Sequence, residues 1–311
     1  MRSERITDQA EGLRRMLVRA SGRVVTVAAA RHGLGATSVV VNLASALAQA
    51  GRDVLILDES LSHNNVPDML ALKPCYDLLD AVRGGKSLRE IILTRQGVRI
   101  LPVVRALQAL PLLSAPQREK LLECLAEITN GVDVILVDAA ISKEPQNSAI
   151  AQSADDAPAA RHITACLSPE QPLLLVLNAT AAAITASYAL IKRMVLQDGR
   201  QNFEIVINKV SDERKAQIVC GNLAQVARRH LRVQIEYLGY IPNDESLKRA
   251  TQLCRPVVEV FPAAPAARAF GELGRNLIAL PTAGNDTATG LSDVLLRLMR
   301  QGVAPNMAHA S

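Results

Sequence analysis

The feature that most constrains the fold of this chain is a series of short, continuously apolar runs that alternate with longer segments of helical character. Val54–Asp58 (VLILD) and Leu173–Leu177 (LLLVL) are apolar at nearly every position. A strand that is apolar on both faces must be covered on both faces, as in parallel sheets. Similar runs occupy Arg23–Ala30, Val98–Val103, Val132–Asp138, Phe203–Asn208 and Ile235–Ile241, and helical patterns occupy Thr37–Ala50, Pro116–Ile128, Thr185–Leu196, Lys215–Leu231 and Pro265–Leu280. The expected fold is therefore α/β, with a mainly parallel twisted sheet and helices on both faces.

Composition and charge narrow the class of protein only a little. The 311 residues are 49% hydrophobic, 2% aromatic and 21% charged, which is typical of a globular chain with an aliphatic core. The net charge of +5 is compatible with a membrane or nucleic-acid partner and selects neither. The five cysteines are scattered, which argues against a zinc or iron–sulfur site. The charged N-terminus is unlike a signal peptide, so we expect a cytoplasmic protein or one peripheral on the cytoplasmic membrane.

A strand–loop–helix near the start of the chain has the form of a phosphate-binding loop. After the first apolar run the chain continues with Arg31, His32, Gly33, Leu34, Gly35, Ala36, Thr37 and Ser38, and then enters a helix. Glycines permit close approach of backbone N–H groups to phosphate, and Thr37 stands where a hydroxyl can bind Mg²⁺. The lysine that normally reaches the β- and γ-phosphates is absent, because its position is Ala36. By local pattern alone, an ordinary glycine-containing turn explains the segment equally well.

Longer motifs further along the chain give the loop its context. The loop leads into VNLASALAQAGRDVLILD; ITASYALIK occupies Ile184–Lys192, and GYIPNDES occupies Gly239–Ser246. From about residue 24 to residue 280 the chain resembles the MinD/ParA family of P-loop ATPases, and most of all its flagellar subgroup, called FlhG or FleN. The resemblance implies a P-loop NTPase-like fold with ATP or ADP and Mg²⁺ as cofactors, and it allows a homodimer.

The resemblance also shows which charged groups of the site are missing. The family's signature lysine falls on Arg31, and its P-loop lysine falls on Ala36. The second carboxylate of the family's D-x-D segment, which helps to position the attacking water, falls on Ser60. Glu59 is adjacent, but in an extended segment its side chain is expected to point the other way.

Two aspartates and an asparagine are kept at family positions. Asp58 and the Walker B position Asp138 are expected, with Thr37, to bind Mg²⁺. The family's Thr-x-x-Gly after Walker B is replaced by residues 139–142 (AAIS). Asn208 matches a position that contacts adenine, and it reads equally well as a residue that caps a turn.

These losses predict weak or absent nucleotide binding and negligible hydrolysis. One positioned electrostatic group commonly accounts for about 10²–10³ in rate. Loss of the lysine, the carboxylate and the sensor glycine together would leave a pseudo-ATPase. Backbone N–H groups at the loop still permit some binding of ADP or ATP.

The N-terminal segment, residues 1–22, carries the motif D-Q-A-x-x-L-R. Its residues suit a helix start followed by an apolar face, and a surface helix packed on its own domain is the simpler interpretation. In FlhG-like proteins this motif docks on FlhF, an SRP-type GTPase, and stimulates its GTP hydrolysis. The resemblance makes Gln9 the residue that orients the attacking water in the partner, acting in trans. The predicted partner-binding residues are Asp8, Gln9, Ala10, Leu13 and Arg14.

The C-terminal segment, residues 291–311, follows a linker predicted at residues 281–290 and contains an apolar stripe at helical spacing. The stripe consists of Leu291, Val294, Leu295, Leu298 and Met299. A helix of this kind lies in a membrane interface or folds back on its own domain, and MinD-like proteins end in a membrane-targeting helix. The polar stretch at residues 142–161 is expected to be a loop.

The sequence thus predicts a P-loop domain at residues 23–280 and several competing functions. The first is a regulator of flagellar number and placement that acts by binding the GTPase FlhF, and also flagellar switch-complex proteins and a flagellar transcription regulator. The second is a working ATPase that switches between cytosol and membrane or the cell pole. The third is a ParA-type DNA partitioning factor, which the N-terminal motif and the C-terminal stripe disfavour, so no direct DNA binding is expected.

Overall fold

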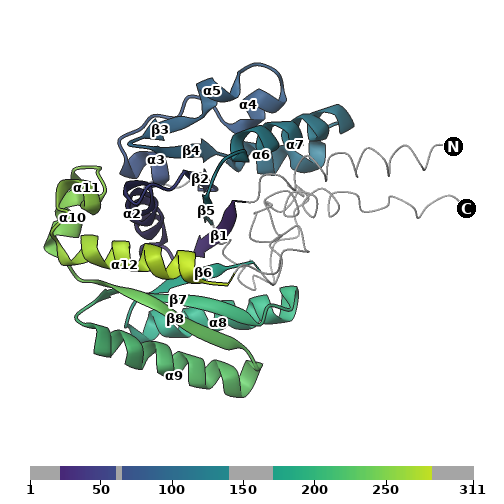
Figure 1. Cartoon of the computed structure of the whole chain (residues 1–311). Coiled ribbons are helices and arrows are strands. Elements are labelled where there is room, and N and C mark those ends of the chain that lie inside the picture. Colours follow the sequence, from purple (N-terminus) through teal and green to yellow (C-terminus); the bar gives the residue numbers. More distant parts are fainter. Residues whose placement is uncertain (1–21, 61–64, 140–170, 282–311) are drawn as a thin grey trace, which may run out of the picture.

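A computed structural model describes residues 22–60, 65–139 and 171–281 (Figure 1). Their strands form one eight-stranded sheet in the order β3-β4-β2-β5-β1-β6-β7-β8. All pairings are parallel except that of β3 with β4. The strands are β1 (Arg23–Ala28), β2 (Val54–Asp58), β3 (Leu93–Arg95), β4 (Val98–Pro102), β5 (Val134–Asp138), β6 (Leu173–Leu177), β7 (Asn202–Val210) and β8 (Gln234–Pro242). The predicted α/β class with a mainly parallel sheet is confirmed.

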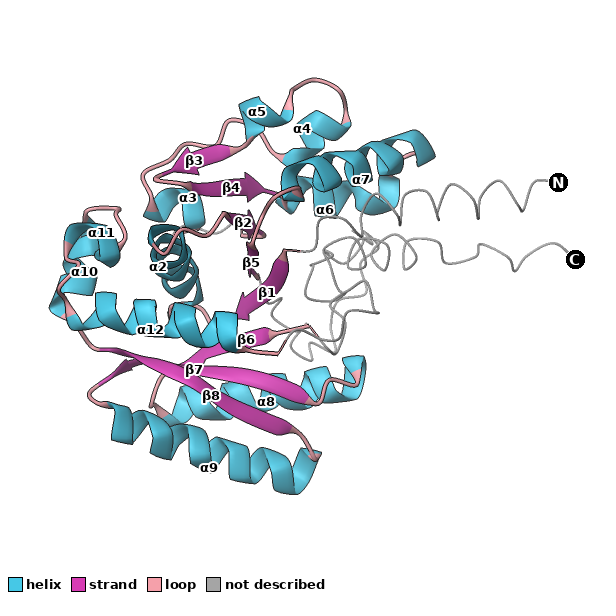
Figure 2. Cartoon of the chain, viewed as in Figure 1, coloured by secondary structure: helices cyan, strands magenta, loops and turns pink. Residues whose placement is uncertain are grey.

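Helices cover both faces of this sheet, as Figure 2 shows by the cyan helices on either side of the magenta strands. They are α2 (Ala36–Gln49), α3 (Val66–Met69), α4 (Leu78–Val82), α5 (Leu88–Ile91), α6 (Val104–Ala109), the 3₁₀ turn η1 (Leu110–Leu112), α7 (Ala115–Thr129), α8 (Ala181–Asp198), α9 (Glu213–Leu231), α10 (Glu245–Gln252), α11 (Val257–Val260) and α12 (Pro265–Ala279). The five predicted helices correspond to α2, α7, α8, α9 and α12, with ends shifted by a few residues.

The central strands bury alternate residues in two separate cores. In β2, Leu55 and Leu57 pack in the core that α4, α6, α7, α8 and α9 share, whereas Val54 and Ile56 pack in the core of α2, α10, α11 and α12. Since successive side chains of a strand point to opposite faces, a strand between two helical layers must be apolar throughout. This requirement explains the continuous apolar runs in the sequence.

The hairpin of β3 and β4 is an element that the apolar runs did not predict. β3 has only three residues, of which Thr94 is exposed, so it shows no periodicity. Gln96 and Gly97 join it to β4 and both have positive φ, of 46° and 82°. Two such residues suit a tight hairpin turn, which makes β3 antiparallel at the edge of the sheet.

Helix α2 is held in place by a buried side chain rather than by apolar contacts alone. Asn42, which is 2% exposed, donates from Nδ2 to the carbonyl of Ser38 at 2.8 Å. Its Oδ1 accepts the N–H of Val257 at 2.7 Å. Asn42 therefore ties α2 to the start of α11 and fixes the helix that follows the glycine loop.

The topology places one end of the sheet in position for a ligand. From β1 the chain moves toward β2 on one side, and β6 later pairs with β1 on the other side. Open α/β sheets bind ligands at the carboxyl ends of strands next to such a reversal of direction. The glycine loop follows β1 at this end, and Asp58 and Asp138 are the last residues of β2 and β5.

Candidate nucleotide-binding site

The loop between β1 and α2 has the backbone of an anion-binding turn. Gly33 has φ 83°, and Gly35, the N-cap of α2, has φ 97°, values that side chains other than glycine rarely adopt. Leu34 between them is buried at 7% exposure and anchors the loop to the core. A left-handed turn that leads into a helix directs successive backbone N–H groups toward one point. The loop therefore retains a cradle for phosphate.

The N-terminus of α2 has no capping group of its own. No side chain caps it and no acidic residue lies in its first turn. By contrast, Asp77 caps α4, Thr180 caps α8 and Asp212 caps α9. The first N–H groups of a helix require an acceptor, and the helix dipole favours an anionic one. The start of α2 at Ala36, Thr37 and Ser38 is thus suited to an anion from outside the chain.

Two residues at the end of β7 contact the carbonyl groups of the loop. Asn208, which is 3% exposed, donates from Nδ2 to the Leu34 carbonyl at 2.8 Å. The exposed Lys209 donates from Nζ to the Gly33 carbonyl at 3.3 Å. Of the two interpretations of Asn208, the geometry supports the turn-capping role, and contact with adenine stays a prediction. Sequence reasoning did not single out Lys209.

Asp58 and Asp138 lie buried beside the loop, and the charge of Asp138 perturbs Asp58. Burial, and then the charge of Asp138, raise the pKa of Asp58 to about 8. Burial raises the pKa of Asp138 to about 7, although a hydrogen bond from the Thr37 side chain opposes the rise. Oδ2 of Asp138 has no hydrogen-bond partner among the described residues. Two neighbouring buried carboxylates with an available oxygen and a hydroxyl form a donor set that a hard divalent cation would stabilise.

The structure corrects the expectation for Glu59. Its side chain was expected to point away, but it is 2% exposed and its charge raises the pKa of both Asp58 and Asp138. The main chain at Ser60 donates to Oδ1 of Asp58 at 3.0 Å, so the chain turns directly after β2. Side chains alternate between the two faces only while a strand stays extended. Because the chain turns directly after β2, the alternation does not extend to Glu59. Glu59 therefore adds negative charge near the two aspartates.

The residues of the site fit Mg²⁺ and the phosphates of a nucleotide. They lack the ammonium at position 36 and the carboxylate at position 60. The Thr37 side chain bonds Asp138, whose charge acts on Asp58, and these three residues would hold Mg²⁺. Ala36, at the start of α2, offers no ammonium to the phosphates, and Arg31 is exposed at the far end of the loop. Position 60 carries a hydroxyl instead of a carboxylate. The site is suited to binding and poorly equipped for phosphoryl transfer.

Several predicted sites lie outside the described residues. They are the motif Asp8, Gln9, Ala10, Leu13 and Arg14, the stripe Leu291, Val294, Leu295, Leu298 and Met299, and the segment 142–161. Within residues 22–60, 65–139 and 171–281, no helix is long and apolar enough to cross a membrane. The same ranges contain no group of three or more histidine, cysteine or acidic residues placed to hold a metal ion.

Comparisons with known proteins agree with the geometry. A family model described as the CobQ/CobB/MinD/ParA nucleotide binding domain matches residues 25–257. The antiactivator FleN of Pseudomonas aeruginosa is 33% identical over 264 residues, which cover 85% of this chain and 89% of FleN. The flagellum site-determining protein YlxH of Helicobacter pylori is 22% identical over 229 residues, 73% of this chain and 72% of YlxH. A solved structure of the septum site-determining protein MinD complexed with Mg-ADP, from Pyrococcus horikoshii, superposes with a TM-score of 0.59 at 23% identity, covering 83% of this chain and 97% of that one.

The glycine loop, the uncapped helix and the aspartates at the ends of β2 and β5 are the features of a P-loop domain. The chain belongs to the CobQ/CobB/MinD/ParA family. Within that family it is a member of the FlhG/FleN type.

Proposed function

We propose that this protein is a regulator of flagellar number and placement that binds nucleotide without appreciable hydrolysis and acts through its partners. The observation that carries the proposal is the combination of a retained phosphate cradle with Ala36 and Ser60 at the two catalytic positions. Support comes from the names of two relatives, an antiactivator and a flagellum site-determining protein.

In this proposal the pocket binds ADP or ATP with Mg²⁺ and does little chemistry. The N–H groups at the start of α2 donate to the phosphates, and Thr37, Asp58 and Asp138 hold the metal, which would neutralise the buried carboxylates and the phosphates together. Each missing electrostatic group is commonly worth about 10²–10³ in rate. Loss of the ammonium at position 36 and the carboxylate at position 60 makes turnover negligible beside that of an intact family member.

The partner-directed activity is assigned to the N-terminal segment. The motif D-Q-A-x-x-L-R would dock on the SRP-type GTPase FlhF, and Gln9 would orient the attacking water there. A transcription activator is a second partner, which the name antiactivator of a relative supports. Flagellar switch-complex proteins are a third.

The described residues next to the two terminal segments support their use as a common docking region. Arg23 begins β1, and its guanidinium donates to the carbonyls of Leu277 and Leu280 at 2.7 and 2.5 Å. The two ends of the described domain therefore lie side by side, at the amino ends of the strands, whereas the nucleotide pocket lies at the carboxyl ends. In the proposal residues 1–22 bind a partner and the C-terminal stripe contacts a membrane from the cytoplasmic side, and both segments are attached to the domain at this end of the sheet.

Stimulation of the GTPase tests the proposal most directly. GTP hydrolysis by FlhF is measured with the wild-type chain, with Gln9→Ala and with the exposed-residue control Gln225→Ala. We expect Gln9→Ala to remove most of the stimulation and Gln225→Ala to leave it unchanged. Equal stimulation by the wild type and Gln9→Ala would overturn the assignment of Gln9.

Restoration of the missing groups tests the loss of hydrolysis. The double variant Ala36→Lys with Ser60→Asp returns the ammonium and the carboxylate to the site. We expect ATP turnover to rise by at least about 10²-fold over the wild type. A wild type that already hydrolyses ATP at the rate of an intact family member, measured beside it, would contradict the pseudo-ATPase assignment.

A working ATPase that cycles between cytosol and membrane is the second candidate. The hydrogen bond between the Thr37 and Asp138 side chains favours it, because this contact orients the metal-binding hydroxyl. The same turnover measurement separates the two candidates.

A further inference from the structure

Three arginines gather where α9 ends and the chain turns into β8. Arg228 and Arg229 lie in the last turn of α9, and Arg232 follows the helix directly. All three are exposed, and none forms an ion pair or a side-chain hydrogen bond with another described residue. No acidic residue occurs between Glu213 and Glu236. The end of α9 is therefore a patch of positive charge that the described domain does not neutralise.

We propose that these three arginines, the basic tip of α9, bind the phosphate groups of anionic lipids and act together with the C-terminal stripe to hold the protein at a membrane. The proposed contact rests on the membrane binding assigned to the stripe under the proposed function. It adds a lipid-binding surface on the folded domain and names the lipid chemistry that this surface recognises.

The turn after α9 places two of the arginines around a hollow on the surface. The N–H of Arg232 donates to the carbonyl of Arg228 at 3.2 Å, which closes the last turn of the helix. Both arginines, with Val233 and Gln234, line a hollow of about 450 Å³. Val233 is buried and anchors the turn to the core. Two guanidinium groups beside one open hollow are suited to a phosphate, because each presents several N–H donors in one plane.

Arg232 occupies a backbone position that favours glycine. Its φ is 57°, in the left-handed region. Helices commonly end in this conformation with glycine, because a Cβ makes it unfavourable. By comparison, α8 ends at Gly199 with φ 66°. Glycine would end α9 at least as well, so the ending of the helix does not account for an arginine at this position.

The basic tip lies at the end of the sheet where the chain leaves the described domain. β8 starts at Gln234, directly after the basic tip, and β1 starts at Arg23, which donates to the carbonyls of Leu277 and Leu280. In the order β1-β6-β7-β8, β8 is three strands from β1, about 14 Å at the usual spacing. Figure 2 shows that α9 and α12 end on the same side of the molecule. A membrane that meets this side of the domain can therefore reach the basic tip.

The number and spacing of the charges favour a lipid surface over DNA. Arg297 and Arg300 accompany the C-terminal stripe, and the basic tip brings the number of arginines to five. Clusters of about four to eight basic residues beside a membrane-contacting segment bind anionic lipid. Proteins that bind DNA through its phosphates commonly make about 6–10 such contacts. The basic tip spans about 6 Å of helix and offers fewer.

Vesicle binding of the full-length chain tests the basic tip. Vesicles contain phosphatidylglycerol and phosphatidylcholine in equal parts, or phosphatidylcholine alone, and bound protein is measured by co-sedimentation at physiological ionic strength. The test variant is Arg228→Gln/Arg232→Gln. The matched control is Arg214→Gln/Lys215→Gln, which removes the same charge from exposed residues about 20 Å away along α9.

The test variant should bind the anionic vesicles about 25-fold more weakly than the wild type, or about fivefold for each arginine. The control should bind as the wild type does. High salt should reduce the difference between the wild type and the test variant, because it screens exposed charges.

The variant Arg232→Gly separates lipid binding from a structural role. Glycine suits the left-handed backbone, so this variant should melt at or above the wild-type temperature. Its binding to anionic vesicles should nevertheless be about fivefold weaker. Wild-type binding by Arg232→Gly together with a lower melting temperature would show that the arginine serves the fold and would overturn its role in lipid binding.

Four other results would overturn the inference. The first is wild-type binding by the test variant, and the second is absent or equal binding of the wild type to anionic and neutral vesicles. The third is release from the vesicles by double-stranded DNA, which would assign the basic tip to nucleic acid. The fourth is release by inorganic phosphate but not by chloride of equal ionic strength, which would indicate a site for a small anion.

Failure of the proposed function would be seen in different measurements. Gln9→Ala changes GTPase stimulation, which is measured without vesicles, and should bind vesicles as the wild type does. Leu295→Asp interrupts the apolar stripe and should lose most vesicle binding. Unchanged binding by Leu295→Asp, with the expected loss in the test variant, would overturn the role of the stripe and retain the lipid contact of the basic tip.

Discussion

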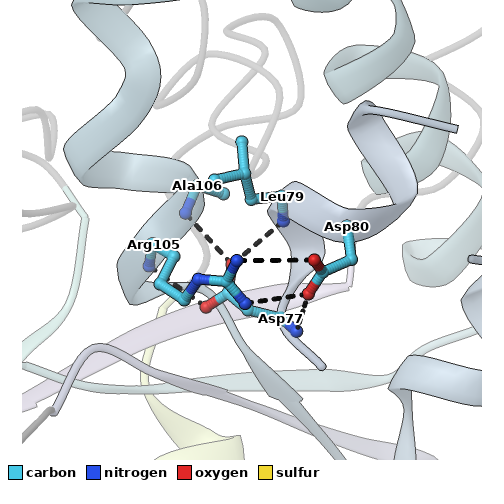
Figure 3. A network of polar contacts seen from close by, with 5 residues as sticks. All are labelled: Asp77, Leu79, Asp80, Arg105 and Ala106. Atoms are coloured by element: carbon cyan, nitrogen blue, oxygen red, sulfur yellow. Dashed lines mark hydrogen bonds and ion pairs between the residues drawn. The ribbon is translucent and has the colours of Figure 1, made fainter. Parts of the chain in front are cut away.

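Asp77 and the pair formed by Asp58 and Asp138 are buried to a similar depth, but their surroundings differ. Asp77, at the junction of α4 and α6, is 5% exposed, and Asp58 and Asp138 at the nucleotide pocket are 2% and 3% exposed. Around Asp77 the chain supplies donors: the N–H groups of Leu79, Arg105 and Ala106 lie 3.0, 3.1 and 3.0 Å from its carboxylate (Figure 3). At the pocket, Asp58 faces the charge of a second aspartate, and an oxygen of Asp138 has no partner among the described residues.

The difference shows how a buried carboxylate can be assigned to structure or to function. Asp77 caps α4 and also accepts N–H groups from the first turn of α6, so one side chain satisfies two helix ends. Burial raises its pKa while these hydrogen bonds oppose the rise. The pocket aspartates also receive hydrogen bonds, from the N–H of Ser60 to Asp58 and from the Thr37 side chain to Asp138, but their pKa values are still raised to about 8 and about 7. A cation from outside would supply the remaining compensation. The predictions below test this contrast.

The largest effect is expected from removal of the Asp77 carboxylate. Asp77→Ala leaves three backbone N–H groups without their acceptor, and we expect the free energy of unfolding to fall by about 3 kcal/mol. Urea unfolding followed by circular dichroism measures the change. Asp77→Asn keeps the shape and one acceptor oxygen and should lose less. A loss below about 1 kcal/mol in Asp77→Ala would show that the junction does not depend on the cap.

Removal of a charge at the nucleotide pocket should raise, rather than lower, the free energy of unfolding. Asp58→Asn keeps the size of the side chain and removes a buried charge, so in EDTA at pH 8 we expect the free energy of unfolding to rise by about 2 kcal/mol. The gain is less than the full pKa shift implies, because the hydrogen bond with the N–H of Ser60 weakens. Asp53→Asn, at an exposed carboxylate, serves as the control. Destabilisation by Asp58→Asn under these conditions would place Asp58 with Asp77 as a structural residue.

The pH dependence of stability follows from the raised pKa of Asp58. The unfolded chain releases the Asp58 proton near the ordinary pKa of 3.8, whereas the folded chain retains it to about 8. Between these values the unfolded state is increasingly favoured as pH rises, so this group makes stability fall with rising pH. We expect melting temperatures of the metal-free protein to decline from pH 5 to pH 8, less steeply in Asp58→Asn. Parallel curves for the two proteins would contradict the assigned pKa.

Mg²⁺ should stabilise the protein by offsetting the buried negative charge of the nucleotide pocket, and it should not act at the Asp77 junction. With 10 mM MgCl₂ we expect the wild type to gain about 1 kcal/mol, as for a site of millimolar affinity, and Asp138→Asn to gain nothing. Arg105→Ala, with the pocket intact, should gain as the wild type does. Thermal unfolding with MgCl₂ or with equal ionic strength of NaCl measures the difference. An equal gain in Asp138→Asn would mean that the cation acts elsewhere.

The smallest effect is expected at the rim of the Asp77 junction. Arg105 Nη1 lies 2.9 Å from Oδ2 of Asp80, and both side chains are partly exposed. Exposed ion pairs contribute little, so Arg105→Ala should cost about 0.5 kcal/mol, measured by urea unfolding. The N–H of residue 105 still donates to the Asp77 carboxylate in this variant. A loss as large as that of Asp77→Ala would mean that the guanidinium, rather than the backbone, holds the junction.

Much of the fold and half of the site follow from local patterns. Val54–Asp58 had to be a strand buried on two faces, because its apolar residues leave no polar face for water. The loop at Gly33 and Gly35 was likewise found by its place after an apolar run, and the aspartates that end β2 and β5 were found by the resemblance to the MinD/ParA family. Sequence reasoning failed at Glu59, where a turn directly after the strand ended the alternation on which the prediction relied.

By itself, the sequence determined the parallel sheet, the place of the phosphate loop and the loss of its ammonium at Ala36, since each depends on residues adjacent in the chain. Only the tertiary structure decided that Lys209 lies against the loop and that Asp77 caps two helices. The residues of each pair are 176 and 29 positions apart, and nothing in the intervening chain marks them as neighbours. Hydrogen bonds act over about 3 Å, and only packing of the sheet and its helices brings such distant groups within that range.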